Sequence, residues 1–400
     1  MIRNSIKAKP QSRRLAFGNR SFNGKPLLIQ RKLPDYRIDF FIALNKACGV
    51  RLCYWQRPFH DQAERRQHLP EAIAFPGHSG ASTLRDCIRL ISVLLATRPA
   101  EVICEAASGF PLFWLLVLLR PWFGYRLLGW GHGINNRDWA RASVGWRFWV
   151  AVFAMKRLQG MILYSSERAE ELQRRVPGLP VYVAPNSLDT ESFCRHSHAL
   201  SSAALSPADK KLRLIFLGRL IESKKLDLAL NALKALTFED WEFRIIGDGP
   251  LRETLVSQYG SDPRIRFLGA ITDPVRLGEE LHQADLMLHP GNLGLAVLHS
   301  FAYACPILSC HSGSATIQHG PEFELLDESN SVLCDAEPSV IAAQLVLLNG
   351  NRPMLKKLGE QAREAVESSR GIPRMVEGFR KALRKIDQTD PESNSLLVAL

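Results

Sequence analysis

The stretch LIFLGRLIESKKLDLALNAL, residues 214–233, indicates a buried strand, a tight turn and an amphipathic helix in direct succession. Its apolar run ends at Leu217, and Gly218 supplies the turn. Beyond the turn, apolar residues recur every three or four positions, which is typical of a helix that packs one face on a sheet. A buried strand followed by such a helix is the repeating unit of a parallel α/β sheet.

The same alternation continues in both directions from this unit. A Ser-, Ala- and His-rich stretch divides the alternating segments into two halves. We therefore expect an α/β protein with two doubly wound, Rossmann-like domains that face each other across a cleft, with ligands at the carboxyl ends of the strands. The further strands are predicted at 27–30, 50–55, 100–107, 125–131, 160–166, 181–186, 242–247, 265–269, 286–290 and 306–310.

The domain boundaries follow from this pattern. A basic, polar stretch opens the chain, and we expect it to be a flexible arm because it has little to bury. The closing segments have helical patterns, and we expect the last helix to pack back on the first domain. The expected parts are an arm at 1–25, a first domain at 26–190, a linker at 191–211, a second domain at 212–370, and a helix with a tail at 371–400.

Composition narrows the classes of partner. The formal charge is +11, and residues 1–25 carry seven Lys/Arg and no acid, so anionic partners are expected. Eight scattered cysteines without a CxxC pair argue against a zinc site and a disulfide framework, and for a reducing cytoplasm. The longest apolar run, 110–119, has ten residues, whereas a membrane-spanning helix needs about 20. No nucleic-acid-binding motif accompanies the basic arm, so we expect no nucleic acid partner.

Arg219 and Lys224 follow the strand that ends at Leu217, at the mouth of the next helix. Cations at the carboxyl edge of a strand, beside the N–H groups that open a helix, suit a diphosphate. Taken alone, the spacing is also that of two solvated surface cations.

Arg219 and Lys224 belong to one of three motifs: GRLIESK at 218–224, IIGDGP at 245–250 and PNSLDTESF at 185–193. The sequence resembles glycosyltransferase family 4, of the GT-B fold, over roughly residues 160–385 and more weakly from about residue 27. Lys225 stands where that family usually has Gly. The matching positions are Gly218, Arg219, Leu220 and Lys224 in the first motif, Ile245, Gly247, Gly249 and Pro250 in the second, and Pro185, Asn186, Asp189 and Phe193 in the third.

The segment LHPGNLGLAVLHSFAYACPIL, residues 288–308, departs from the family. The family has two Glu separated by seven residues, which contact the donor sugar and the ribose; here Gly291 and Asn292 occupy the place of the first, and His299 that of the second. Asn292, Gly294, Leu295 and the N–H groups of 293–295 are still expected to hold the donor at the start of the helix, and His299 is expected to bond a ribose hydroxyl, because imidazole both donates and accepts. Simple packing of His299 on its helix remains the alternative. The short loop resembles that of polysaccharide-assembling members.

In the first half, glycines flank His132, and the resemblance places this His near the donor sugar as a catalytic residue. The alternative is a His that only completes a turn. The resemblance also implies that Arg37, Tyr164 and Asn186 lie on the acceptor side. Each has a plain alternative: Arg37 as a surface residue, Tyr164 beside the N-cap Ser165, and Asn186 in a turn at a strand end.

The function implied is transfer of a sugar from a UDP- or GDP-sugar to a glycan or polyprenyl-linked acceptor in cell-surface polysaccharide assembly, with retention. The leaving diphosphate would take the acceptor proton, and neither a metal nor a cofactor is expected. A GT-B sugar-nucleotide epimerase or hydrolase, or a catalytically dead nucleotide-sugar-binding subunit, is the alternative. Aromatic and basic residues in 137–157 favour docking on the anionic inner face of the plasma membrane over a role in the core. The expected location is therefore cytoplasmic and peripheral.

Overall fold

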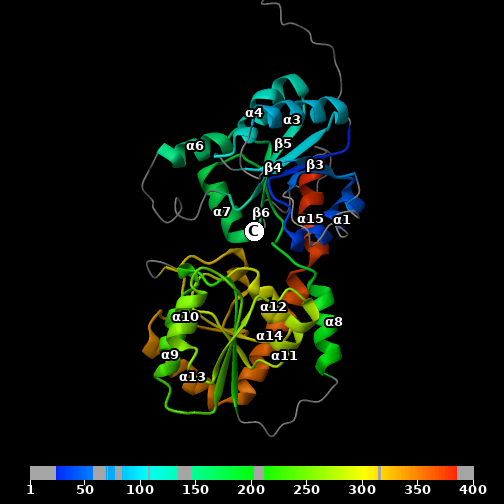
Figure 1. The fold of residues 1–400 in the computed structure, drawn as a ribbon. Coiled ribbons are helices and arrows are strands. Elements are labelled where there is room, and N and C mark those ends of the chain that lie inside the picture. Colours follow the sequence, from blue (N-terminus) through cyan, green and yellow to red (C-terminus); the bar gives the residue numbers. More distant parts are fainter. Residues whose placement is uncertain are drawn as a thin grey trace, which may run out of the picture.

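The computed structural model describes residues 24–56, 69, 71–76, 83–106, 109–133, 146–201, 211–313 and 317–384. Nearly all of the expected arm, residues 134–145, half of the expected linker and the tail from 385 lie outside these ranges. The described chain forms two α/β domains, one above the other in Figure 1, each built on one parallel sheet.

The first sheet has seven parallel strands in the order β3-β2-β1-β4-β5-β6-β7. Its order reverses between β1 and β4, which is the topological switch point of a doubly wound sheet. Apolar clusters on both faces of the sheet bury it under helices. The strands are β1 Leu27–Gln30, β2 Arg51–Gln56, β3 Ile73–Pro76, β4 Glu101–Glu105, β5 Arg126–Gly131, β6 Gly160–Leu163 and β7 Val181–Val183, and the helices are α1 Ile38–Cys48, α3 Leu84–Thr97, α4 Pro111–Phe123, α6 Trp146–Met155 and α7 Ser166–Arg175.

The second sheet has six parallel strands in the order β10-β9-β8-β11-β12-β13, with its switch point between β8 and β11. The residues that predicted the fold form β8, a short 3-10 helix η3 (Glu222–Lys224) and α9. The elements are β8 Leu212–Leu217, β9 Trp241–Ile246, β10 Ile265–Gly269, β11 Leu286–Leu288, β12 Ile307–Cys310 and β13 Ser331–Cys334, with α9 Leu226–Lys234, α10 Arg252–Tyr259, α11 Pro274–His282, α12 Ala296–Ala302, α13 Pro338–Asn349 and α14 Arg352–Ser369.

The expected linker at 191–211 is wrong over its first half, where the chain forms helix α8 (Thr190–Ser201). This helix packs on α11, α12 and α14 of the second domain. Its buried residues are Thr190, Cys194 and Ser197, so small side chains take the place of a stripe of large apolar ones. The sequence pattern therefore conceals the helix.

The chain crosses between the domains twice, near 184–190 and near 369–372. After the second crossing, α15 (Ile372–Leu383) packs on α1, β6 and β7 of the first domain, where Figure 1 shows it in red beside α1. A side chain at Gly378 would overlap the backbone of β7, so glycine permits this close packing. Both crossings place the carboxyl edges of the two sheets opposite one another.

Candidate functional site

The carboxyl edge of the second sheet is built by backbone packed on backbone. Gly218 follows β8, and Gly247 follows β9 with a φ of 141°, a conformation that favours glycine. A Cβ on Gly247 would overlap the carbonyl oxygen of Gly218, and one on Gly249 would overlap the backbone of Leu220. These glycines thus bring the two loops together at the place where the motifs predict a donor site.

The two predicted cations lie at this edge in different surroundings. Arg219 is exposed, and within the described part of the chain no hydrogen bond or ion pair engages its side chain. Lys224 is partly buried, and its Nζ donates to the backbone oxygen of Asn292 at 2.5 Å. Burial lowers the pKa of Lys224, and Glu322 partly offsets this effect. Neither cation is locked to a carboxylate here, so both are available to an anion.

The compact loop after β11 is fastened to η3. The N–H groups of Gly291 and Asn292 donate to the carbonyls of Lys224 and Ser223, at 3.2 and 2.9 Å. A Cβ on Gly291 would overlap the backbone of Lys224, so this approach needs glycine. The loop therefore holds the backbone around Lys224 in place.

The side chains predicted to hold the donor from this loop are only partly available. The Oδ1 atom of Asn292 accepts from the N–H of Gln318 at 2.8 Å, and the N–H of Leu293 donates to Nδ1 of His319 at 3.1 Å. The space around Gly294 is open, and Leu295 precedes α12. Of the predicted donor groups in 293–295, the N–H of Leu293 is thus already used.

Two histidines lie close behind the loop. The ring of His299 stacks on Phe193 of α8, with centroids 4.8 Å apart, and burial lowers its pKa to about 4. His289 is completely buried against Phe216, and neither of its ring nitrogens has a well-formed hydrogen-bond partner in the described structure. Burial and the charge of Lys224 lower the pKa of His289 to about 3. Both rings are therefore neutral near pH 7.

His132 and Tyr164 form part of the opposite wall, at the ends of β5 and β6. Their rings meet edge to face, with centroids 4.8 Å apart. Burial, and then the charge of Arg37, lowers the pKa of His132, so its imidazole is neutral and can both donate and accept a hydrogen bond. The structure thus brings two of the predicted first-domain residues into contact.

Arg37 lies beneath this wall rather than on the surface, and is only 4% exposed. Its guanidinium bonds Asn186 and Met375. Four aromatic rings surround it at 5.2 to 5.8 Å: Tyr36, Phe40, Trp130 and Tyr164. Arg37 and Asn186 are thus occupied with the protein itself, since their apolar surroundings require polar partners.

A cavity of about 220 Å³ separates the two walls. One side comes from the end of β6 and the start of α7, and the other from the segment between β12 and the short helix η4 (Pro321–Leu325). The lining is His132, Tyr164, Ser165, Glu167, Arg168, Ser312, His319, Gly320, Pro321, Phe323 and Glu324. His319 connects this cavity to the loop that holds Lys224.

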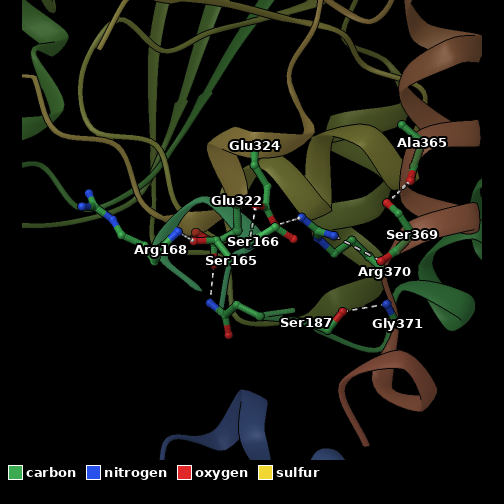
Figure 2. A network of polar contacts seen from close by, with 11 residues as sticks. Ser165, Ser166, Arg168, Ser187, Glu322, Glu324, Ala365, Ser369, Arg370 and Gly371 are labelled. Atoms are coloured by element: carbon green, nitrogen blue, oxygen red, sulfur yellow. Dashed lines mark hydrogen bonds and ion pairs between the residues drawn. The ribbon is translucent and has the colours of Figure 1, made fainter. Parts of the chain in front are cut away.

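Sequence reasoning missed the acids of η4. Glu322 accepts a hydrogen bond from Asn186, and Glu324 accepts from the N–H of Ser166 at 3.0 Å and from Arg370 at 2.8 Å. Figure 2 shows Glu324 between Ser166 and Arg370. Their partners are far away in the chain, so no local motif identifies these carboxylates.

Within the described ranges, no group of three or more His, Cys, Asp or Glu is arranged to hold a metal ion. In the same ranges, no helix combines the length and apolarity that a membrane crossing requires.

Comparison with known proteins bears on this geometry. Residues 211–351 match the family model described as "Glycosyl transferases group 1". No curated protein sequence matches the chain. Among solved structures, Anabaena Alr3699/HepE in complex with UDP aligns with a TM-score of 0.67 at 15% identity, over 90% of this chain and 99% of its own. The fold is GT-B.

Two further solved structures correspond to the two enzyme alternatives, a glycosyltransferase and an epimerase. The lipopolysaccharide outer core galactosyltransferase WaaB aligns with a TM-score of 0.63 at 16% identity, over 90% of this chain and 99% of its own. A putative UDP-N-acetylglucosamine 2-epimerase from Listeria monocytogenes aligns with a TM-score of 0.57 at 14% identity, over 92% and 97%. At these identities the likeness shows the fold, and the chemistry must be argued from the site.

Proposed function

We propose that this protein is a glycosyltransferase that takes a sugar from a nucleotide diphosphate, with UDP or GDP as the nucleotide. The observation that carries the proposal is the cation pair Arg219 and Lys224 at the glycine-built edge of the second sheet. Lys224 is fixed by the loop that reaches the interdomain cavity through His319. The match of residues 211–351 to glycosyl transferases group 1 also supports a glycosyltransferase.

In the proposed reaction, the bond between the sugar's anomeric carbon and the diphosphate breaks while a bond to an acceptor hydroxyl forms on the same face. The leaving diphosphate takes the acceptor proton. Arg219 and Lys224 stabilise the negative charge that develops on that group. His132, which is neutral, supplies a hydrogen bond to the donor sugar. The chemistry needs no further cofactor.

The test is calorimetric titration with UDP, GDP and ADP and with their sugar conjugates, using wild type, Arg219→Ala and a matched control. Arg266, an exposed arginine of the outermost strand β10, provides the control Arg266→Ala. Loss of a charge-assisted hydrogen bond weakens affinity by roughly tenfold to a hundredfold, so Arg219→Ala should bind much more weakly. The control should bind as wild type does. Unchanged affinity in Arg219→Ala would remove the basis of the proposal.

An epimerase or hydrolase remains the second candidate, because the Listeria protein shares the fold. A donor sugar incubated without acceptor separates the possibilities. A transferase releases little nucleotide until acceptor is added. An epimerase changes the sugar alone, and a hydrolase releases free sugar. A dead binding subunit would bind the donor and release nothing under either condition.

We further propose that the acceptor is a glycan or a polyprenyl-linked sugar at the inner face of the plasma membrane, within cell-surface polysaccharide assembly. Trp149 and Phe153 of α6 are 58% and 49% exposed, and Phe153 stacks on Trp114 of α4. The cations Lys156 and Arg157 follow them at the surface. Exposed aromatics next to cations suit an anionic lipid interface, and the location would be cytoplasmic and peripheral. Trp139 and Arg141 belong to the stretch 137–157 that is expected to dock, and they lie outside the described ranges.

Flotation with anionic vesicles tests this docking. Trp149→Ser/Phe153→Ser should lose most vesicle binding. Leu347→Ser is the matched control, since Leu347 is 65% exposed on α13 of the other domain. Equal flotation of all three proteins would contradict the assignment of the surface.

A further inference from the structure

Three buried polar side chains meet where the two domains touch. Arg37, Asn186 and Glu322 are 4%, 8% and 2% exposed. Arg37 belongs to the first domain, at the 3-10 helix η1 (Asp35–Arg37) after β1. Asn186 belongs to the crossing segment, and Glu322 belongs to η4 of the second domain. A buried polar contact between three separate parts of a chain requires every member to find a partner.

The three side chains form one hydrogen-bonded series. The Arg37 guanidinium donates to Oδ1 of Asn186, and Nδ2 of Asn186 donates to Glu322. The amide thus uses its acceptor toward the cation and its donor toward the anion. Burial raises the pKa of Glu322, while the bond from Asn186 and the charge of Arg37 act in the opposite direction. The amide therefore connects a buried guanidinium group to a buried carboxyl group.

A second contact connects the same short helix to the first domain. Glu324 accepts from the backbone N–H of Ser166, the first residue of α7, and from Arg370 at the second crossing. Ser187 and Gly371 also join the two crossings, through a 2.6 Å hydrogen bond. Figure 2 shows these contacts as one network. η4 is thus attached to the first domain at two points.

These attachments lie beside the interdomain cavity. Gly320, Pro321 and Phe323 line it on one side, and Tyr164 and Ser165 on the other. Glu322 does not line the cavity but lies between Pro321 and Phe323 in the chain, and Asn186 follows β7, the strand next to β6. Their hydrogen bond therefore connects the segments that bear the two walls. A change of that separation alters which reacting groups can approach one another.

We propose that Asn186 and Glu322 are positioning residues that hold the two domains at the spacing seen in this structure, with Arg37 as the fixed end of the series. The inference goes beyond the proposed function, because it concerns the unliganded protein and does not require that a donor binds. A second carboxylate in place of the Asn186 amide would put two like charges in a buried contact, which favours separation and hydration of the contact.

The test exchanges the amide and the carboxylate. Asn186→Asp alone places two carboxylates together in the contact. Asn186→Asp/Glu322→Gln restores one cation, one carboxylate and one amide in reversed order, so that the introduced carboxylate accepts from both the Arg37 guanidinium and the introduced amide. Glu322→Gln alone is the control, because the glutamine oxygen still accepts from Asn186. All four proteins are studied at pH 8 without nucleotide.

Two measurements report the spacing. Small-angle scattering gives the radius of gyration, and hydrogen exchange reports protection of the Ser166 amide, which donates to Glu324. Asn186→Asp should expand the protein and speed exchange at Ser166 by about tenfold or more. The double variant should return both values to those of wild type, and Glu322→Gln should stay near them.

Wild-type scattering and exchange in Asn186→Asp would overturn the inference. So would a double variant that behaves as the single one does. Should Asn186→Asp fail to fold, the comparison of the double variant with wild type decides the matter, because only restored spacing agrees with the proposal. Circular dichroism establishes folding in each case. The result does not depend on UDP, so failure here and failure of the proposed function are separate observations.

Discussion

The carboxyl edges of the two sheets are both aimed at the cleft, but they are built differently. At the second sheet, glycines allow backbone to pack on backbone, and the cations Arg219 and Lys224 have no carboxylate bound to them in the described structure. At the first sheet, aromatic rings fill the edge, and the charged groups neutralise one another, as in the ion pair of Arg31 with Glu105. The edge of the second sheet therefore has cations that an anion can reach, whereas the charged groups at the edge of the first sheet are already paired with one another.

This difference agrees with a division of labour. A preorganised backbone with unpaired cations stabilises a developing anion at little reorganisation cost. A neutral wall with a neutral His132 and Tyr164 is suited to hydroxyl groups, because it offers hydrogen bonds without attracting charge. The comparison predicts that substitutions at equivalent places of the two edges will have unequal effects.

The largest difference is expected between Gly247→Ala and Gly131→Ala. Gly247 follows β9 and Gly131 is the last residue of β5, and their φ angles are 141° and 139°. A methyl group on Gly131 meets nothing within 4 Å, so only backbone strain of about 1–3 kcal/mol applies. A methyl group on Gly247 adds overlap with the Gly218 carbonyl, so we expect a loss of more than about 3 kcal/mol.

Urea denaturation measures both losses. Gly294→Ala is the control for the second edge, since no atom lies within 4 Å of the added methyl and its stability should stay within about 0.5 kcal/mol of wild type. Equal losses for Gly247→Ala and Gly131→Ala would show that backbone packing does not distinguish the two edges.

A smaller difference in stability is expected between a substitution of His319 and one of His132. His319 accepts from Leu293 at Nδ1 and donates from Nε2 to the Cys310 carbonyl at 2.9 Å, so its neutral ring joins the donor loop to β12. Burial lowers the pKa of both histidines. Protonation of His319 would put a second N–H where Leu293 needs an acceptor. At pH 8, His319→Asn should cost about 1 kcal/mol, because the Cys310 carbonyl loses its donor.

The lowered pKa of His319 also predicts how the free energy of unfolding changes with pH. A histidine whose folded pKa is depressed contributes stability above its unfolded pKa of about 6.5, and this stability is lost as the pH falls through the folded value. His319→Asn should therefore lose less stability than wild type between pH 7 and 5. His132→Asn should show a similar change in slope but a smaller loss at pH 8, since no hydrogen bond of His132 is present in the described structure. Identical curves for wild type and His319→Asn would contradict this role.

The second edge was also the more predictable one. A continuous apolar run, a glycine and spaced cations are local features, so residues 214–233 were sufficient to predict β8, the turn and α9. The edge strands β3 and β13 were missed, although the equally short β1 and β12 were predicted. The two edge strands are only partly buried, so they lack the continuous apolar run that marks a central strand. Glu322 and the burial of Arg37 were missed for another reason. Their partners come from the opposite domain and the crossing segment, and only tertiary structure brings these together.

The smallest expected effect concerns Lys225, where the related family usually has glycine. Lys225 adopts the left-handed conformation, with φ 51° and ψ 37°, between η3 and α9. This conformation costs a residue with a Cβ roughly 1 kcal/mol, whereas glycine adopts it freely but loses more entropy on folding. Lys225→Gly should therefore raise the free energy of unfolding by about 0.5 kcal/mol or less. Lys234→Gly, at the last residue of α9, should lower it by about 0.5–1 kcal/mol, because glycine disfavours the helix and the contact of Lys234 with the Tyr259 ring is lost. A loss of similar size in both variants would mean that the Lys225 side chain, and not only its backbone, supports the edge at which Arg219 and Lys224 lie.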